Sequence, residues 1–119
     1  MKNFKVTRIK EGEKKPTRFF SSAQENKVAK ACGGSVTKNS GATTFQKGDI
    51  LQNSCLIECK TQTKNKETFT LHKEWFIKNE REALFMGKPY SAVVFDFGPG
   101  ENQYYIIDEY MFKKLLEVL

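Results

Sequence analysis

Residues 49–60 read DILQNSCLIECK, and this stretch decides the fold. Two apolar runs flank the polar pair Asn53-Ser54, which is typical of a tight hairpin loop. The pattern predicts strands over residues 49–51 and 55–60. A two-residue loop then places Leu51 opposite Leu56 and Ile50 opposite Ile57. Continuing this register places Asp49 opposite Glu58.

The predicted register brings three charged side chains together at one end of the hairpin. Residues directly opposite in an antiparallel pair share a face and lie about 5 Å apart. Lys60 follows Glu58 by two positions, so it emerges on the same face as Glu58. Cys59 points to the other face, into apolar packing. The sequence therefore predicts two carboxylates, Asp49 and Glu58, beside one ammonium group.

Two neighbouring carboxylates repel each other unless a proton or a cation lies between them. Mg²⁺ takes one or two carboxylates together with water and substrate phosphate, and Mn²⁺ is the alternative ion. Such an ion can activate water against a phosphodiester, while Lys60 orients that water or stabilises charge on the phosphate. Glu25 is a candidate third carboxylate. The competing interpretation is ordinary: Asp49 as a turn residue, and Glu58 and Lys60 as an exposed strand pair.

The remaining elements follow from periodicity and from start and stop signals. Ser22 and Glu25 have capping-box spacing, and Gly33-Gly34 can end a helix. Asp108 can cap a final helix. The predicted helices cover residues 23–31, 72–86 and 108–119. The further predicted strands lie within residues 35–48, as a short strand beside a mobile loop, and at residues 91–97 and 103–107.

This order of elements predicts the α/β class. We expect a single domain over residues 1–119, built on a central mixed five-stranded sheet flanked by helices. A chain of 119 residues has no room for two domains. The strand at residues 91–97 is almost continuously apolar, as expected for a strand that is buried on both faces.

Composition and charge narrow the function classes. The net charge is +6, and residues 1–18 hold seven Lys and Arg against two Glu. This segment is either a flexible basic arm that follows phosphates or a solvated terminus. No apolar run approaches the roughly 18 residues of a membrane span, and the N-terminus does not resemble a secretory signal. Three cysteines do not make a disulfide framework. We expect a cytoplasmic protein.

Six basic residues are candidate DNA-phosphate contacts because of their positions around the predicted acidic site or in the basic segment. They are Lys15, Arg18, Lys38, Lys47, Lys64 and Lys66.

Other side chains have more ordinary interpretations. One histidine, His72, and scattered cysteines do not form a zinc site, and we expect His72 at a helix cap or on the surface. Cys55 and Cys59 are expected in the core. Asp96 is expected to be a satisfied polar group, with metal binding as the alternative. No glycine-rich phosphate-binding motif occurs, so we expect no nucleotide cofactor.

Phe19 and Phe20 precede the predicted first helix. We expect them to pack as a hydrophobic staple or at a dimer contact. Stacking on unpaired bases is the alternative.

The order of these motifs resembles the PD-(D/E)XK nuclease superfamily. The segments that carry the resemblance are Glu25, Asn39-Ser40-Gly41-Ala42, Lys47-Gly48-Asp49-Ile50 and Ile57-Glu58-Cys59-Lys60-Thr61. Within that superfamily the chain looks most like the archaeal-type Holliday junction resolvases and their phage-borne relatives, over about residues 19–119. Gly48 and Cys59 depart from the family pattern, which has a proline and more often a β-branched residue there.

The resemblance implies a restriction-endonuclease-like fold and a homodimeric, Mg²⁺-dependent endodeoxyribonuclease that nicks paired strands of a four-way DNA junction. On the family's catalytic positions lie Glu25, Asp49, Glu58 and Lys60, with Ser40 as its loop serine. Small size and family likeness favour a phage or prophage origin in a bacterial or archaeal host. The alternatives are a restriction-like or repair nuclease acting on duplex or branched DNA, and a DNA-binding module on this fold that does not cleave.

Overall fold

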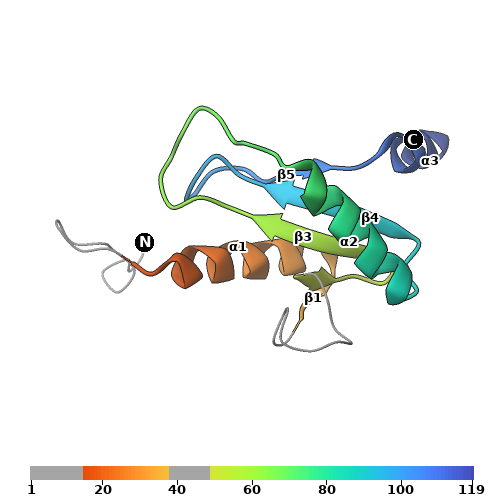
Figure 1. Cartoon of the computed structure of the whole chain (residues 1–119), viewed down its shortest axis with the longest axis horizontal. Helices are drawn as coiled ribbons and strands as arrows, with labels where there is room; N and C mark the ends of the chain where they lie inside the picture. Colours follow the sequence, from red (N-terminus) through yellow and green to blue (C-terminus); the bar gives the residue numbers. More distant parts are fainter. Residues whose placement is uncertain (1–14, 38–48) are drawn as a thin grey trace.

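The computed structural model describes residues 15–37 and 49–119 as a mixed sheet with helices packed on it (Figure 1). The helices are α1 (Thr17–Cys32), α2 (Lys73–Phe85) and α3 (Glu109–Glu117). The strands are β1 (Ser35–Val36), β2 (Ile50–Leu51), β3 (Cys55–Lys60), β4 (Tyr90–Phe95) and β5 (Tyr104–Ile106). The prediction of an α/β fold with a mixed five-stranded sheet is confirmed.

The strands lie side by side in chain order, from β1 at one edge to β5 at the other. Among the described strands, only β3 and β4 run parallel, and the three other pairings are antiparallel. A parallel pair needs a crossover connection, and α2 supplies it between β3 and β4. Because β4 is covered on both faces, Ala92, Val93 and Val94 are all buried, as its apolar sequence predicted.

The two faces of the sheet carry different partners. Helix α1 packs on β1, β2 and β3, while α2 packs on β3 and β4. On the α1 side, Val28 of α1 meets Ile50, Ile57 and Val94 in an apolar cluster. Alternation along β3 then turns Leu56, which is fully buried, towards α2. The side-chain amide of Asn79 in α2 donates to the carbonyl oxygens of Leu56 (3.2 Å) and Ala92 (3.0 Å), which ties α2 to both parallel strands.

Helix α1 begins earlier than its sequence signal indicated. The expected start at Ala23 with Ser22 as the cap is wrong, because Pro16 occupies the N-cap position and Thr17 and Arg18 are already helical. Pro16 has φ −65°, the value that its ring fixes and that suits a helix start. Starting there allows Phe20 to be buried in the first turns. Tertiary packing of this ring outweighs the local capping box.

Most of the other element ends are close to their predictions. Gly33 adopts φ +68° after α1, a left-handed conformation that favours glycine, and the backbone N–H of Gly34 donates to the Ala29 oxygen at 3.0 Å. Asp108 caps α3, since its Oδ1 accepts from the Met111 N–H at 2.9 Å. Strand β4 ends at Phe95, before the predicted Phe97, because Asp96 accepts from the Gly98 N–H (3.0 Å) and closes a turn.

Helix α3 projects at the end of the molecule beyond β5 (Figure 1). Met111 packs against the apolar cluster, whereas Tyr110, Phe112 and Leu116 are more than half exposed. Among the described residues, no helix has the length and apolar character needed to cross a lipid bilayer.

Candidate active site

The hairpin between β2 and β3 has the predicted register. Ile50 lies opposite Ile57 and Leu51 opposite Leu56, and the Gln52 N–H closes the loop by donating to the Cys55 oxygen at 2.9 Å.

Asp49 differs from its prediction, because it lies just outside β2 and is not paired with Glu58 in the strand register. Its backbone N–H donates to the Ile57 oxygen at 3.2 Å, and its Oδ2 accepts from the Cys59 N–H at 2.8 Å. The Asp49 carboxylate therefore lies against the β3 backbone, beside Glu58.

Glu58 and Lys60 share a face of β3, as predicted from the two-residue period. The Lys60 Nζ lies 3.2 Å from the Glu58 Oε2, and both side chains are largely buried. The same ammonium group lies 4.5 Å from the centroid of the Trp75 ring in α2. A carboxylate on one side and an aromatic face on the other hold the Lys60 amine at a defined position.

Glu25 approaches the same end of the hairpin from α1. It is 7% exposed, and its Oε2 lies 3.9 Å from the guanidinium of Arg18, which is itself largely exposed. Burial raises the pKa of Glu25, and the nearby Asp49 raises it further, while Arg18 opposes the rise and Glu58 adds to it. The three acids therefore influence one another electrostatically, although they come from α1, the start of β2 and β3.

Glu58 shows the same effect. Burial is the largest cause that raises the pKa of Glu58, and the nearby Asp49 is the next largest. The Lys60 ammonium group and Lys78 lower it and offset the rise only in part. Folding has therefore placed carboxylates together at an electrostatic cost. A divalent cation between the carboxylates would relieve that cost by supplying positive charge.

Cys59 has a different setting from the plain core position that was expected. Its side chain is half-buried against the apolar cluster, and it is a free thiol, like Cys32 and Cys55. Burial raises the pKa of the Cys59 thiol, with Asp49, Glu25 and Glu58 as further causes in that order. The thiol therefore stays protonated beside the three acids, on the α1 side of β3.

The fit of a metal ion depends on these acids. In residues 15–37 and 49–119, no group of three or more His, Cys, Asp or Glu side chains is arranged to hold a metal. Mg²⁺ needs only one or two protein carboxylates, because water and substrate phosphate complete its shell. Asp49 and Glu58 are chemically suited to that role, with Glu25 close enough to affect them.

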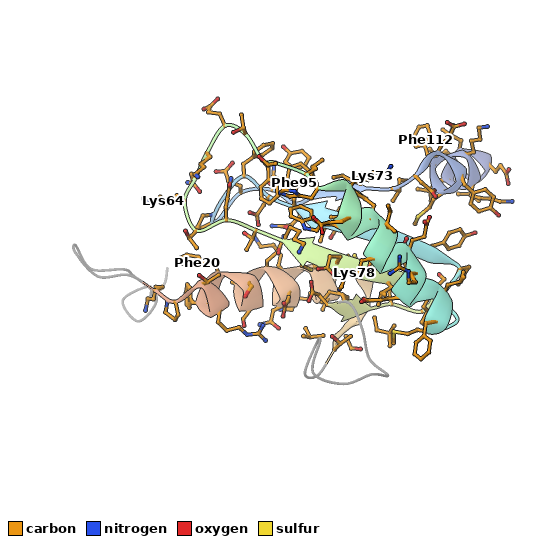
Figure 2. The ribbon with its side chains drawn as sticks, in the orientation of Figure 1. Phe20, Lys64, Lys73, Lys78, Phe95 and Phe112 are labelled. Atoms are coloured by element: carbon orange, nitrogen blue, oxygen red, sulfur yellow. The ribbon has the colours of Figure 1, made fainter. Side chains whose placement is uncertain are left out.

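Some of the other predicted site residues belong to the part of the chain that the structure describes and some do not. Ser40, Lys38 and Lys47 lie outside the described residues. Lys64 and Lys66 are exposed on the segment that follows β3, and Figure 2 shows Lys64 at the outer end of that loop. The Lys15 Nζ lies 5.2 Å from the centroid of the Phe19 ring, which is itself 36% exposed. Lys15 and Arg18 are thus at the N-terminal end of α1, and Arg18 approaches Glu25.

Two α2 side chains in the site were not singled out from the sequence. Trp75 contacts the Lys60 amine, and Lys78 lies one helical turn further along the same helix. The Lys78 Nζ pairs with Glu82 at 2.9 Å and also interacts favourably with Glu58 and Asp49. The i, i+3 spacing of Trp75 and Lys78 places them on one helix face, and this was the signal available in the sequence.

Asp96 is the satisfied polar group that the sequence indicated. It is 4% exposed and accepts from the Thr61 hydroxyl at 2.7 Å and from the Gln103 Nε2 at 2.9 Å. The Gln24 Nε2 in turn donates to the Gln103 Oε1 (2.9 Å) and to the Lys60 backbone oxygen (2.7 Å). This network fixes the end of β3 against α1, the helix that carries Glu25.

The raised pKa values make a prediction about stability. A carboxyl group whose pKa is raised by folding binds its proton more tightly in the native state than in the unfolded chain. In metal-free protein, ionisation of Glu25 and Glu58 therefore destabilises the fold. The loss begins as pH rises through the glutamate pKa of the unfolded chain, near 4.3, and is complete above the raised pKa of the folded protein. Glu58→Gln is expected to raise the thermal unfolding temperature at pH 7 and to change it little at about pH 3.5, below both values, as measured by circular dichroism in EDTA.

The exposed substitution Glu101→Gln is the matched control, since it also removes one negative charge and Glu101 does not contribute to the raised pKa of Glu25 or Glu58. If Glu101→Gln raised the unfolding temperature as much as Glu58→Gln, the effect would not be specific to the surroundings of Glu58. If Glu58→Gln raised the unfolding temperature equally at acidic and neutral pH, ionisation of Glu58 would not be its cause.

Comparison of the chain with protein-family models, curated proteins and solved structures gives no match. The functional assignment therefore rests on the side chains at the β2–β3 hairpin and on their surroundings.

Proposed function

We propose that this protein is a metal-dependent endodeoxyribonuclease that resolves four-way DNA junctions in the cytoplasm. The observation that carries the proposal is the grouping of Asp49, Glu58 and Lys60 at one end of the β2–β3 hairpin, with Glu25 of α1 electrostatically coupled to both carboxylates. Two acids can hold a divalent ion and an amine can stabilise charge on a phosphate, so this group is suited to metal-assisted phosphodiester hydrolysis.

Each residue has a defined role in this proposal. Asp49 and Glu58 would hold Mg²⁺, or Mn²⁺ in its place, with Glu25 as the additional acid. When bound, the ion would supply Lewis acidity towards the phosphodiester and would lower the pKa of a water molecule. Lys60, held between Glu58 and Trp75, stabilises negative charge that develops on the phosphate or orients the attacking water. Ser40, Lys38 and Lys47 keep their predicted roles in the catalytic loop and in phosphate binding.

The charge distribution supports a phosphate-rich substrate. The chain carries a net charge of +6, and the exposed Arg18, Lys64 and Lys66 lie on α1 and on the segment that follows β3. Contacts between lysine or arginine and phosphate give affinity without base sequence. This suits an enzyme that distinguishes DNA by shape.

A homodimer is part of the proposal because a four-way junction needs two symmetric cuts. The exposed apolar side chains of α3, with Phe112 at 52% and Leu116 at 51%, supply a surface that a second copy can cover. Figure 2 labels Phe112 on this outer helix, at a distance from the loop where Lys64 lies.

The experiment is cleavage of a synthetic four-way junction and of a linear duplex built from the same arms, each with and without Mg²⁺. We expect Mg²⁺-dependent nicking of the junction at least about tenfold faster than of the duplex, which corresponds to about 1.4 kcal/mol of transition-state discrimination. Equal rates on both substrates would replace the resolvase with a nuclease of broader substrate range.

A second candidate is a DNA-binding module that does not cleave. The observation that favours it is the direct Glu58–Lys60 ion pair, which already neutralises one of the two carboxylates. Junction binding without cleavage in Mg²⁺ or Mn²⁺ would support this candidate.

A further inference from the structure

Most aromatic side chains in residues 15–37 and 49–119 lie outside the buried core. Among the described residues, Phe20 is the only aromatic residue in the buried core, and the rest of that core is aliphatic or small. Aromatic rings bury more apolar area than aliphatic side chains, so a core of this size normally uses them. Outside the core, such rings keep part of their apolar surface in contact with solvent.

Six of these rings form one continuous group, here called the aromatic cluster. Its members are Phe69, His72, Trp75, Phe95, Phe97 and Tyr104. Each ring centroid lies between 4.8 and 6.3 Å from that of a neighbour. Tyr104 is 47% exposed, His72 is exposed and the others are half-buried. The cluster therefore presents aromatic surface to solvent.

The aromatic cluster starts at the candidate active site and leads away from it. The Trp75 ring centroid lies 4.5 Å from the Lys60 amine, and Phe69 links Trp75 to Phe95. Tyr104, on the edge strand β5, is the exposed member at the other end. Figure 2 shows Phe95 and Lys73 at the side of the sheet where the segment after β3 enters α2.

The chain segment that carries Phe69, His72 and Trp75 has a net positive charge. Residues 60–75 contain four lysines, Lys60, Lys64, Lys66 and Lys73, against two glutamates. Lys64, Lys66 and Lys73 are exposed. Aromatic rings at the surface with lysines beside them suit a chain of unstacked bases joined by phosphates, because bases stack on rings and lysines attract the backbone. An apolar peptide would not account for the lysines, because it has no negative charge for them to attract.

We infer that the aromatic cluster binds unpaired nucleotides of a DNA strand by stacking, next to the site where the backbone is cut. This inference rests on the proposed function and deepens it, because it names the part of the substrate that is held: a short unpaired stretch, as arises where strands exchange at a branch. Stacking of bases on aromatic side chains is the main sequence-independent source of affinity in proteins that bind single strands.

The first test uses the wild-type protein in EDTA, so that it does not depend on cleavage. The probes are a fluorescein-labelled dodecamer of thymidine and a labelled strand of abasic sites with the same length and charge. We expect the thymidine strand to bind at least about fivefold more tightly than the abasic strand, the lower end of what one stacked base gives. The chain has one tryptophan, Trp75, so its fluorescence reports on the cluster directly. We expect the thymidine strand to quench it and the abasic strand to leave it nearly unchanged.

The second test compares two exposed tyrosines. Tyr104→Ala removes a ring of the aromatic cluster, whereas Tyr110→Ala removes a ring that is 60% exposed on α3. Tyr110 is a matched control because it is an exposed tyrosine outside the aromatic cluster, and the Lys114 Nζ lies 5.5 Å from its ring centroid. We expect Tyr104→Ala to weaken binding of the thymidine strand at least about fivefold, Tyr110→Ala to weaken it less than about twofold, and neither to change abasic binding.

Equal affinity of the wild type for the thymidine and abasic strands would overturn the inference, as would equal losses in the two tyrosine variants. These outcomes are separate from the fate of the nuclease proposal. Stacking on the thymidine strand without junction cleavage would support the binding surface and contradict the nuclease proposal. Junction cleavage without stacking would support the nuclease proposal and contradict the binding surface.

Discussion

Asp49→Asn and Glu58→Gln are each expected to reduce junction cleavage by at least about 10³-fold, equivalent to about 4 kcal/mol of transition-state stabilisation. Both changes keep the size of the side chain and remove its negative charge. The asparagine side chain in Asp49→Asn retains an oxygen that can accept from the Cys59 N–H, so the hairpin end should keep its geometry. The loss therefore reports on the carboxylate charge and not on unfolding. The measurement is single-turnover cleavage of a labelled junction in Mg²⁺.

DNA binding should respond in the opposite direction. Removing a carboxylate beside the substrate phosphates reduces repulsion, so both variants are expected to bind the junction as tightly as the wild type or more tightly. Metal binding supplies a third readout, because Trp75 contacts Lys60 and Lys60 pairs with Glu58. Titration of Mn²⁺ is expected to change tryptophan fluorescence in the wild type and not in Asp49→Asn.

The control for this pair is again Glu101→Gln, which should cleave at the wild-type rate. Wild-type cleavage by Asp49→Asn and Glu58→Gln would remove both residues from the active site. Loss of cleavage accompanied by a comparable loss of junction binding would indicate a structural role for the two carboxylates.

Leu56→Ala is expected to lower the free energy of unfolding by about 2–5 kcal/mol, the cost of a buried leucine and the cavity it leaves. Leu56 is fully buried, and its carbonyl oxygen accepts from Asn79 of α2. The total free energy of unfolding of native proteins is only about 5–15 kcal/mol, so the variant loses a large share of its stability. Urea denaturation followed by far-UV circular dichroism measures the change.

Leu84→Ala is the matched control, since Leu84 is on α2 and 78% exposed. We expect an effect within about 0.5 kcal/mol, because alanine is at least as good a helix former and little apolar area is lost. Equal losses in the two variants would contradict the assignment of Leu56 to the packed layer between β3 and α2.

Local patterns were informative where an element's chemistry is contained in neighbouring residues. The hairpin register followed from Asn53-Ser54 between two apolar runs, and the shared face of Glu58 and Lys60 followed from the two-residue period of a strand. The caps at Gly33 and Asp108 were recognisable because each depends on the chemistry of a single residue: a left-handed backbone favours glycine, and an aspartate oxygen accepts from a backbone N–H. These features need no knowledge of distant segments.

Local patterns failed where distant segments compete. The Ser22–Glu25 spacing indicated a helix start that burial of Phe20 overrides. The expected pairing of Asp49 with Glu58 gave way to a hydrogen bond from the Cys59 N–H, which no propensity indicates. A similar case is the network of Asp96, Gln103 and Gln24, which joins the end of β4, the segment before β5 and α1.

The sequence by itself determined the α/β class, the order of the elements and the register that puts Glu58 and Lys60 on one face, because period and turn chemistry are local properties. Only the tertiary structure decided that Glu25 approaches the same acids, that Trp75 holds the Lys60 amine and that most of the described aromatic rings lie outside the core. These depend on how α1 and α2 pack on the sheet, and packing is a competition among all the buried surfaces of the chain.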